Sequence, residues 1–307
     1  MQISIPGKVM LSGEYAVLYG APSVLIPVPR HITISQSEDS RKNTYSPVIT
    51  EALKINIPEL QRLEENNELK QIEIDREEFF NMDADGKLVK LGLGLSAAEA
   101  VGVVSLRFKR CGLDWSDTGN HALQYALEAH TKAQGGRGSG ADVAVCFYQR
   151  PIIFIKLKYN VAVEVIGKEQ IKKNIPLTLV WTGLPANTRK YVDKFNHWIS
   201  SNVEAENLLN RLIEISGEIS GKWFSESQNG LYDYLDQYDT IICDCMNSAG
   251  IDYKIPVHHE IENWAKSNGG RAKPTGAGGG DMILLIGELP LNELSNKLVI
   301  QLDAIIG

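Results

Sequence analysis

The chain has 307 residues, 43% of them hydrophobic and 22% charged, a composition typical of a globular protein with one large or two average domains. Its 31 basic and 38 acidic residues give a formal net charge of −7, which argues against nucleic-acid binding through bulk positive charge. No apolar run approaches the roughly 18 residues of a membrane span, and no signal-peptide pattern is present, so we expect a cytoplasmic protein without a membrane partner. The spacing of the four cysteines supports neither a disulfide framework nor a zinc site.

The first 38 residues predict short strands separated by turns. Alternating apolar residues indicate strands at 2–5, 15–19, 23–26 and 31–36. Lys8 and Glu14 lie between the first two strands, in a connection bracketed by glycines. Core positions rarely carry charge, so these two residues are either solvated turn residues or functional groups. The polar residues 40–90 predict only exposed helix or loop.

The stretch at residues 90–106 is the most informative part of the chain, because two glycines and a serine lead directly into a helical pattern. Apolar residues then recur at helical spacing as far as Phe108, and a stop follows at Cys111 and Gly112. The first N–H groups of a helix have no internal partner and favour anions, so this loop is a candidate phosphate site. By itself, the pattern is equally compatible with a tight connection.

A second glycine cluster, residues 135–140, follows another predicted helix. Leu123, Ala126, Leu127 and His130 share one face of this helix. His130 is therefore either a ligand or acid-base group, or a histidine buried in the core with its hydrogen bonds satisfied.

The second half of the chain mixes strands and helices without regular alternation. We expect a hairpin at 151–166, strands at 177–181 and 282–286, and helices up to residue 200 and at 204–219, 226–250, 256–268 and 290–304. A third glycine cluster, residues 273–281, precedes the strand at 282–286. This order indicates an α+β fold, and a charged segment near residue 170 suggests domains at 1–170 and 171–307.

The common nucleotide-binding patterns are missing: there is no Walker sequence, no Gly-x-Gly-x-x-Gly between a strand and a helix, and no protein-kinase motif set. The three glycine clusters instead resemble, in order, motifs of the GHMP kinase superfamily. They are Pro6-Gly-Lys-Val-Met-Leu-Ser-Gly-Glu14, Gly92-Leu-Gly-Leu-Ser-Ala-Ala98 and Thr275-Gly-Ala-Gly-Gly-Gly-Asp281. The resemblance implies an N-terminal α/β domain and a ferredoxin-like C-terminal domain.

Two further stretches, residues 129–144 and 181–189, are similar to the phosphomevalonate kinases within that superfamily. This similarity implies an enzyme of the mevalonate pathway, a monomer or homodimer, that transfers the γ-phosphate of ATP to 5-phosphomevalonate and gives 5-diphosphomevalonate. The alternatives are mevalonate kinase, another small-metabolite kinase of this superfamily, or a non-catalytic nucleotide-binding member. A related decarboxylase fits residues 134–143 poorly.

The resemblance also implies roles for individual residues, with ATP and Mg²⁺ as cofactors. Lys8 and Asp142 would be catalytic, and Ser96 and Glu128 would hold Mg²⁺. The ATP phosphates would contact the loop residues Gly92, Leu93, Gly94, Leu95, Ser96, Ala97 and Ala98, and the acceptor would contact Ser139, Gly140, Gly278, Arg137, Arg189 and Lys273. The sequence departs from the family pattern at two places. Leu95 replaces a serine, and Thr131 stands where mevalonate kinases carry a glutamate, so Glu128 is offered in its place.

Overall fold

The computed structural model describes residues 1–37, 44–64, 71–118, 120–136, 138–172 and 175–302. Its packing divides the chain into two compact units, each assembled from three segments. The first unit comprises Met1–Lys8, Pro27–Phe80 and Leu93–Gln149, and the second comprises Val9–Ile26, Asn81–Gly92 and Arg150–Gly307. The domain boundary expected near residue 170 stays a prediction.

The connection expected over residues 6–15 is wrong up to Ser12, because strand β1 runs without a break over Gln2–Ser12, and a turn follows only at residues 13–15. Gly7 lies within this strand and packs directly on the backbone of a later loop. A Cβ added at Gly7 would lie 2.8 Å from the carbonyl oxygen of Leu93, and the amide of Lys8 donates to that same oxygen at 2.9 Å. The glycine therefore serves a close approach inside a strand, and Lys8 has a fixed strand position.

The strand expected at 15–19 is also wrong, because these residues form the 3₁₀ helix η1 (Ala16–Tyr19). A distant tyrosine holds the turn that precedes it. The hydroxyl of Tyr238 accepts hydrogen bonds from the amides of Gly13 and Glu14, both at 3.0 Å, and Tyr15 then adopts a φ of 60°. The strands expected at 23–26 and 31–36 are parts of a single strand, β2 (Ser23–Gln36).

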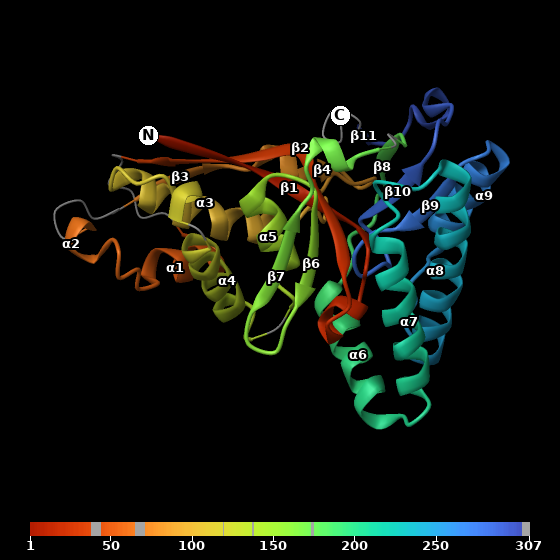
Figure 1. Ribbon diagram of the computed structural model, residues 1–307. Helices are drawn as coiled ribbons and strands as arrows, with labels where there is room; N and C mark the ends of the chain where they lie inside the picture. The colour runs from red at the N-terminus through yellow and green to blue at the C-terminus, as the bar shows by residue number, and fades with distance from the viewer. Residues whose placement is uncertain (38–43, 65–70, 119, 137, 173–174, 303–307) are drawn as a thin grey trace. The chain divides into compact units, whose positions relative to one another are not determined.

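Helix α3 (Leu95–Arg110) forms the centre of the first unit, and its predicted position is confirmed. It is buried on nearly every side and packs against three other helices, as Figure 1 shows. These are α1 (Pro47–Lys54), α4 (His121–Ala133) and α5 (Ala141–Tyr148). Strand β3 (Ile72–Asp75) pairs antiparallel with residues 33–36 of β2, and the unit also contains α2 (Gln61–Glu64), η2 (Glu77–Phe79) and η3 (Trp115–Thr118).

Two buried charges on α3 tie it to its surroundings in the first unit. Arg107, 6% exposed, donates to both carboxylate oxygens of Glu64 and to the carbonyl oxygens of Ala52 and Ile55 at the end of α1. Glu99, 3% exposed, accepts from Ser46 and Arg76. Because buried charges are costly unless they are paired and hydrogen-bonded, these contacts hold α3 in place against α1 and its neighbours.

The second unit contains a four-stranded antiparallel sheet in the order β11-β8-β10-β9. Its strands are β8 (Leu177–Trp181), β9 (Arg271–Pro274), β10 (Met282–Ile286) and β11 (Val299–Gln301). Numbered along the chain, the spatial order is 4-1-3-2, as in the ferredoxin-like arrangement that the resemblance implies. The hairpin expected at 151–166 is confirmed as β6 (Ile152–Lys156) and β7 (Val161–Val165), and β6 pairs with residues 23–25 of β2.

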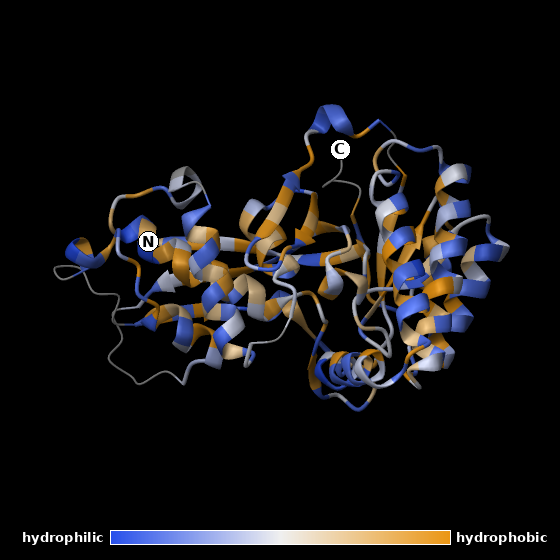
Figure 2. Cartoon of the chain, turned by 60° about the horizontal axis from the view of Figure 1, so that its bottom comes forward, coloured by the Kyte–Doolittle hydropathy of each residue, from blue (hydrophilic) through white to orange (hydrophobic). Residues whose placement is uncertain are grey.

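Four helices accompany this sheet in the second unit, at the expected places. They are α6 (Thr188–Ser201), α7 (Ala205–Ser220), α8 (Gln228–Ser248) and α9 (Pro256–Ser267). Each carries both hydrophobic and hydrophilic residues along its length, the pattern of helices with one face packed and one exposed (Figure 2). The chain also forms the short strands β4 (Phe80–Met82) and β5 (Leu88–Lys90) and the 3₁₀ turn η4 (Lys168–Gln170).

The helix expected at 290–304 is wrong. Residues 291–294 form only the 3₁₀ turn η5 (Leu291–Leu294), and β11 follows. Val299 and Ile300 pair with Val180 and Leu179 of β8, so tertiary pairing overrides the local pattern. Residues 303–304 lie outside the described residues. The fold class, α+β, is confirmed, and within the described part of the chain no helix is both long and apolar enough to cross a membrane.

A histidine buried at the start of α9 makes stability depend on pH. His258 is fully buried and its Nδ1 accepts from the amide of Ile255, while burial and the nearby charge of Lys254 lower its pKa to about 4. An unfolded histidine titrates near about 6.5, so between these two values the unfolded chain binds a proton that the folded chain excludes. We expect the free energy of unfolding to fall as the pH drops from about 6.5 to 4, by up to about 3 kcal/mol from this residue.

Urea unfolding across this pH range measures the effect, with His258→Asn as the matched control. The asparagine oxygen can still accept from the Ile255 amide, but the side chain does not titrate. The variant should therefore lose less stability than the parent on acidification. Equal losses in both proteins would show that carboxylates alone govern the acid response.

Candidate functional site

The loop before α3 has the geometry of an anion site, although only part of its backbone is available. Gly94 caps the helix with a φ of 81° and offers no side-chain cap to the first helical amides. The amides of Ala97 and Ala98 donate to the Gly94 carbonyl, while the side chains of Leu93 and Leu95 are buried. A phosphate at this helix start would therefore meet the amides near Leu95 and Ser96 rather than those of the whole stretch 92–98.

Lys8 lies directly against this loop. A Cβ added at Gly94 would stand 2.8 Å from Cγ and 2.9 Å from Cε of Lys8, so the aliphatic stem of Lys8 lies directly across the glycine. The Lys8 side chain is half-buried, and within the described residues its ammonium group forms no ion pair. A cation that lies beside a helix start and has no carboxylate partner is suited to bind an anion, such as a phosphate group next to the one at the helix start.

Ser96 and Asp142 meet at a buried histidine. The hydroxyl oxygen of Ser96 lies 3.1 Å from Nε2 of His130, and Oδ2 of Asp142 lies 3.9 Å from the same nitrogen. His130 is only 3% exposed, whereas Asp142 is about one quarter exposed. The structure thus joins the helix starts of α3 and α5 through one imidazole of α4.

Helix α5 begins much as α3 does. Gly140 caps it with a φ of 86°, and a Cβ there would lie 2.5 Å from Leu127. The hydroxyl of Ser139 accepts from the amide of Ala141, so this oxygen already has a structural partner. Asp142 stands in the first helical turn, where a carboxylate is favoured by the helix dipole.

Lys8 and Asp142 also act on the same buried thiol. Burial raises the pKa of Cys146, the carboxylate of Asp142 raises it further, and the ammonium of Lys8 opposes that rise. Charges that shift a pKa in this way lie within a few side chains of the group. Lys8, Ser96 and Asp142, which the sequence predicts from separate motifs, therefore lie in one neighbourhood of the first unit.

The third glycine motif organises a loop in the second unit. Gly278 has a φ of 72° and packs so tightly that a Cβ would lie 2.3 Å from the ring of Tyr253. Asp281 accepts from the Ala186 amide at 3.1 Å, and its carboxylate lies against Gly92, where an added Cβ would be 2.3 Å away. Both Gly92 and Gly278 thus have structural reasons to be glycine, besides any contact with a ligand.

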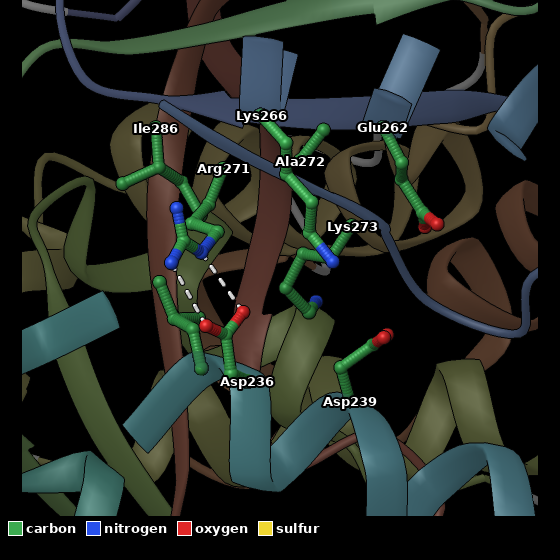
Figure 3. A pocket seen from close by; sticks show the side chains of 9 residues that line it. Asp236, Asp239, Glu262, Lys266, Arg271, Ala272, Lys273 and Ile286 are labelled. Atoms are coloured by element: carbon green, nitrogen blue, oxygen red, sulfur yellow. Dashed lines mark hydrogen bonds and ion pairs between the residues drawn. The ribbon is translucent and has the colours of Figure 1, made fainter. Parts of the chain in front are cut away.

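Lys273, a predicted substrate cation, is instead neutralised inside the second unit. It is 4% exposed and donates to Oε1 of Glu14 at 2.5 Å. Oε2 of Glu14 accepts from the hydroxyl of Tyr238 at 2.6 Å, so both carboxylate oxygens are occupied. Figure 3 shows Lys273 beside Asp239, Glu262 and Lys266 in the small pocket that these side chains line.

The other predicted residues have different surroundings. Arg189 is an exposed residue in the first turn of α6, in the second unit. Glu128 is half exposed and pairs with Lys132 on α4 at 2.6 Å. It stands two positions before His130, on a different side of the helix, because neighbours on one face are three or four residues apart. Arg137 lies outside the described residues.

Comparisons with known proteins support the resemblance in sequence and fold. No family model matches the chain. The phosphomevalonate kinase of Streptomyces sp. (strain CL190) is 23% identical over 334 aligned positions, covering 90% of this chain and 87% of that protein. The solved structure of Streptococcus pneumoniae phosphomevalonate kinase with phosphomevalonate and AMPPNP superposes with a TM-score of 0.76 at 16% identity, covering 98% of this chain and all of the other. The Methanococcus jannaschii mevalonate kinase gives 0.71 at 18%, covering 98% and 97%.

The chain has the GHMP kinase fold. The resemblance that the three glycine motifs indicate is thereby confirmed at the level of fold and overall similarity. Within this fold, Leu95 is 7% exposed, so the residue that replaces the usual serine belongs to the core and presents no group to a ligand. Ser96 is therefore the hydroxyl that this loop offers.

Sequence reasoning left two residues of the GHMP kinase fold without an assigned role. The sequence does not decide whether His130 is a core residue or a ligand, and it assigns no role to the Gln134 side chain. The amide nitrogen of Gln134 lies 2.9 Å from Nε2 of His130. Their four-residue spacing on one helix face was the available signal, but only tertiary contacts reveal that Ser96 lies opposite.

Proposed function

We propose that the chain is an ATP-dependent phosphotransferase of the mevalonate pathway that converts 5-phosphomevalonate to 5-diphosphomevalonate. The observation that carries this proposal is the neighbourhood of Lys8, Ser96 and Asp142 beside the start of α3. Phosphoryl transfer needs positioning and charge neutralisation more than covalent chemistry. The likeness to the Streptomyces and Streptococcus phosphomevalonate kinases supports the choice of acceptor.

The donor would be ATP, as the AMPPNP in the Streptococcus complex suggests. In this chain the amides near Leu95 and Ser96 would hold phosphate oxygens at the positive end of α3. The Lys8 ammonium would contact both the γ-phosphate and the attacking oxygen of the acceptor, and so neutralise charge as the phosphoryl group moves.

The Ser96 hydroxyl and the Asp142 carboxylate fit Mg²⁺, because both are hard oxygen ligands. Among the described residues no group of three or more His, Cys, Asp and Glu side chains gathers to hold a metal. That is compatible with Mg²⁺, which in such sites takes few protein ligands alongside phosphates and water. Ser96 is the protein group positioned for it, and bound Mg²⁺ would neutralise charge on the ATP phosphates.

Asp142 has a different task for each acceptor. An alcohol must lose its proton, and a carboxylate within reach would serve as general base. A phosphate monoester has a second pKa near about 6 and needs little deprotonation at neutral pH. With phosphomevalonate, Asp142 would mainly act on Lys8 through its charge, since the two side chains, both in the described part of the chain, form no ion pair. The enzyme would be cytoplasmic and would act on small molecules.

Mevalonate kinase is the second candidate, and the pairing of Lys273 favours it. A phosphorylated acceptor needs extra cations, and Lys273 is already bound to Glu14.

A coupled ADP-release assay with phosphomevalonate, mevalonate, galactose and homoserine tests the proposal. We expect kcat/KM for phosphomevalonate to exceed that for mevalonate at least about tenfold, because cations arranged for a phosphate are left unpaired by an uncharged terminus. Turnover of mevalonate at an equal or higher rate would establish the second candidate. Nucleotide binding without turnover of any acceptor would identify a non-catalytic member.

A further inference from the structure

His130 contacts Ser96 and also lies close to Asp142, and its Nε2 has a further partner. Gln134 caps the C-terminus of α4, four residues after His130, and its amide nitrogen lies 2.9 Å from Nε2 of His130. The other end of this amide faces elsewhere, because Oε1 of Gln134 lies 3.4 Å from where a Cβ of Gly138 would stand. The amide therefore presents its N–H groups, and not its oxygen, to the imidazole.

With the amide nitrogen facing Nε2, this contact determines which nitrogen of a neutral His130 carries the proton. An amide nitrogen can only donate, and a neutral imidazole has one donor and one acceptor nitrogen. Nε2 must then be the acceptor, and the proton lies on Nδ1. Ser96 contacts the same Nε2 at 3.1 Å, so its hydroxyl donates to the ring.

The direction of the Ser96 hydroxyl decides what the serine can bind. A hydroxyl has one proton and two lone pairs. With the proton directed to His130, the lone pairs face away from it and suit a cation, whereas a phosphate oxygen would require the proton itself. Oδ2 of Asp142, at 3.9 Å, receives no hydrogen bond from an unprotonated Nε2 and keeps its capacity for another partner.

We propose that His130 is a positioning residue: held as an acceptor by Gln134, it turns the Ser96 hydroxyl so that the oxygen lone pairs are presented to Mg²⁺ bound with ATP. The identity of the ligand, Mg²⁺ with ATP, rests on the proposed function. The arrangement of Gln134, His130 and Ser96 does not. It assigns Ser96 to the metal rather than to a phosphate oxygen. It also gives a buried polar side chain beside the phosphate loop a definite task.

The first experiment reads the tautomer directly, without nucleotide. Protein labelled with ¹⁵N-histidine is examined by long-range ¹H–¹⁵N correlation at pH 8, and the His130 signals are assigned by their loss in His130→Gln. We expect a protonated Nδ1 and an unprotonated Nε2. Gln134→Leu, at an exposed position, should shift the population toward protonated Nε2. A protonated Nε2 in the parent protein would overturn the proposal.

The second experiment measures AMPPNP affinity with Mg²⁺ and with EDTA. Residues that hydrogen-bond to metal ligands typically contribute roughly 10- to 100-fold in metal affinity. His130→Leu should therefore lower the ratio of AMPPNP affinity with Mg²⁺ to that with EDTA by about tenfold or more. His130→Gln, which can offer an amide oxygen to Ser96, should retain most of it. His121→Leu is the control, since this histidine of the same helix is 70% exposed and pairs with Glu59.

The outcomes separate the two proposals. An unchanged Mg²⁺ effect in a folded His130→Leu would overturn the positioning role while leaving the kinase proposal standing. If the parent protein bound no nucleotide under either condition, the proposed function would fail, and the tautomer spectrum would still decide the geometry of His130. Should His130→Leu not fold, the Gln134→Leu spectrum and the comparison of His130→Gln with the parent protein give the answer.

Discussion

Lys8→Met is expected to lower kcat for ADP release by roughly 10²- to 10³-fold, with the fold preserved. The methionine keeps the aliphatic stem that lies across Gly94 but loses the ammonium group, so packing is retained and charge is not. A preorganised charge that stabilises a transition state contributes about this much when it is lost. Steady-state kinetics with the best acceptor, together with circular dichroism, measures the effect.

Two further variants sharpen this experiment. Lys8→Arg keeps the positive charge but changes its shape, and should also be impaired if the ammonium acts as a point charge between two phosphates. Lys132→Met removes an exposed lysine that pairs with Glu128 on the same unit, and should leave kcat unchanged. If Lys8→Met kept kcat within about threefold of the parent protein, Lys8 would not be part of the catalytic machinery.

How far the sequence predicts this molecule depends on whether a residue's conformation is set by its neighbours or by distant partners. Helix α3 was predicted because local periodicity and a glycine start are enough to specify it. Residues 15–19 were assigned wrongly because Tyr238, more than 200 positions away, holds the preceding turn. The helix expected at 290–304 failed for a similar reason, since β11 forms by pairing with β8.

The candidate site shows the same division. Motif resemblance selected Lys8, Ser96 and Asp142, and the structure places them together in the first unit. Resemblance could not decide between the possible roles of His130, because the identity of its contacts is a property of packing. Lys273 was chosen as a free cation from its place beside a motif, but its partner Glu14 lies 259 positions earlier in the chain. Sequence position shows which residues are near a motif, and not which charges are already paired.

Lys273→Met is expected to lower the free energy of unfolding by about 3–5 kcal/mol, because it leaves the Glu14 carboxylate buried without its cation. Glu14 is 2% exposed, and among the described residues its other side-chain partner is the hydroxyl of Tyr238. The contact between Lys273 and Glu14 therefore compensates a charge that water cannot reach. Urea unfolding followed by tryptophan fluorescence measures the loss.

A double replacement separates the cost of an unpaired charge from the value of the pair. Glu14→Leu combined with Lys273→Met removes both charges, and should recover about half of the stability lost in Lys273→Met alone, because no carboxylate is left uncompensated. Lys266→Met is the control: this lysine lines the same pocket but is exposed, and its loss should change stability by less than about 0.5 kcal/mol. A loss below about 1 kcal/mol in Lys273→Met would mean that Glu14 does not depend on Lys273 for its compensation. Lys273 would then be available to bind the substrate, as its motif suggests.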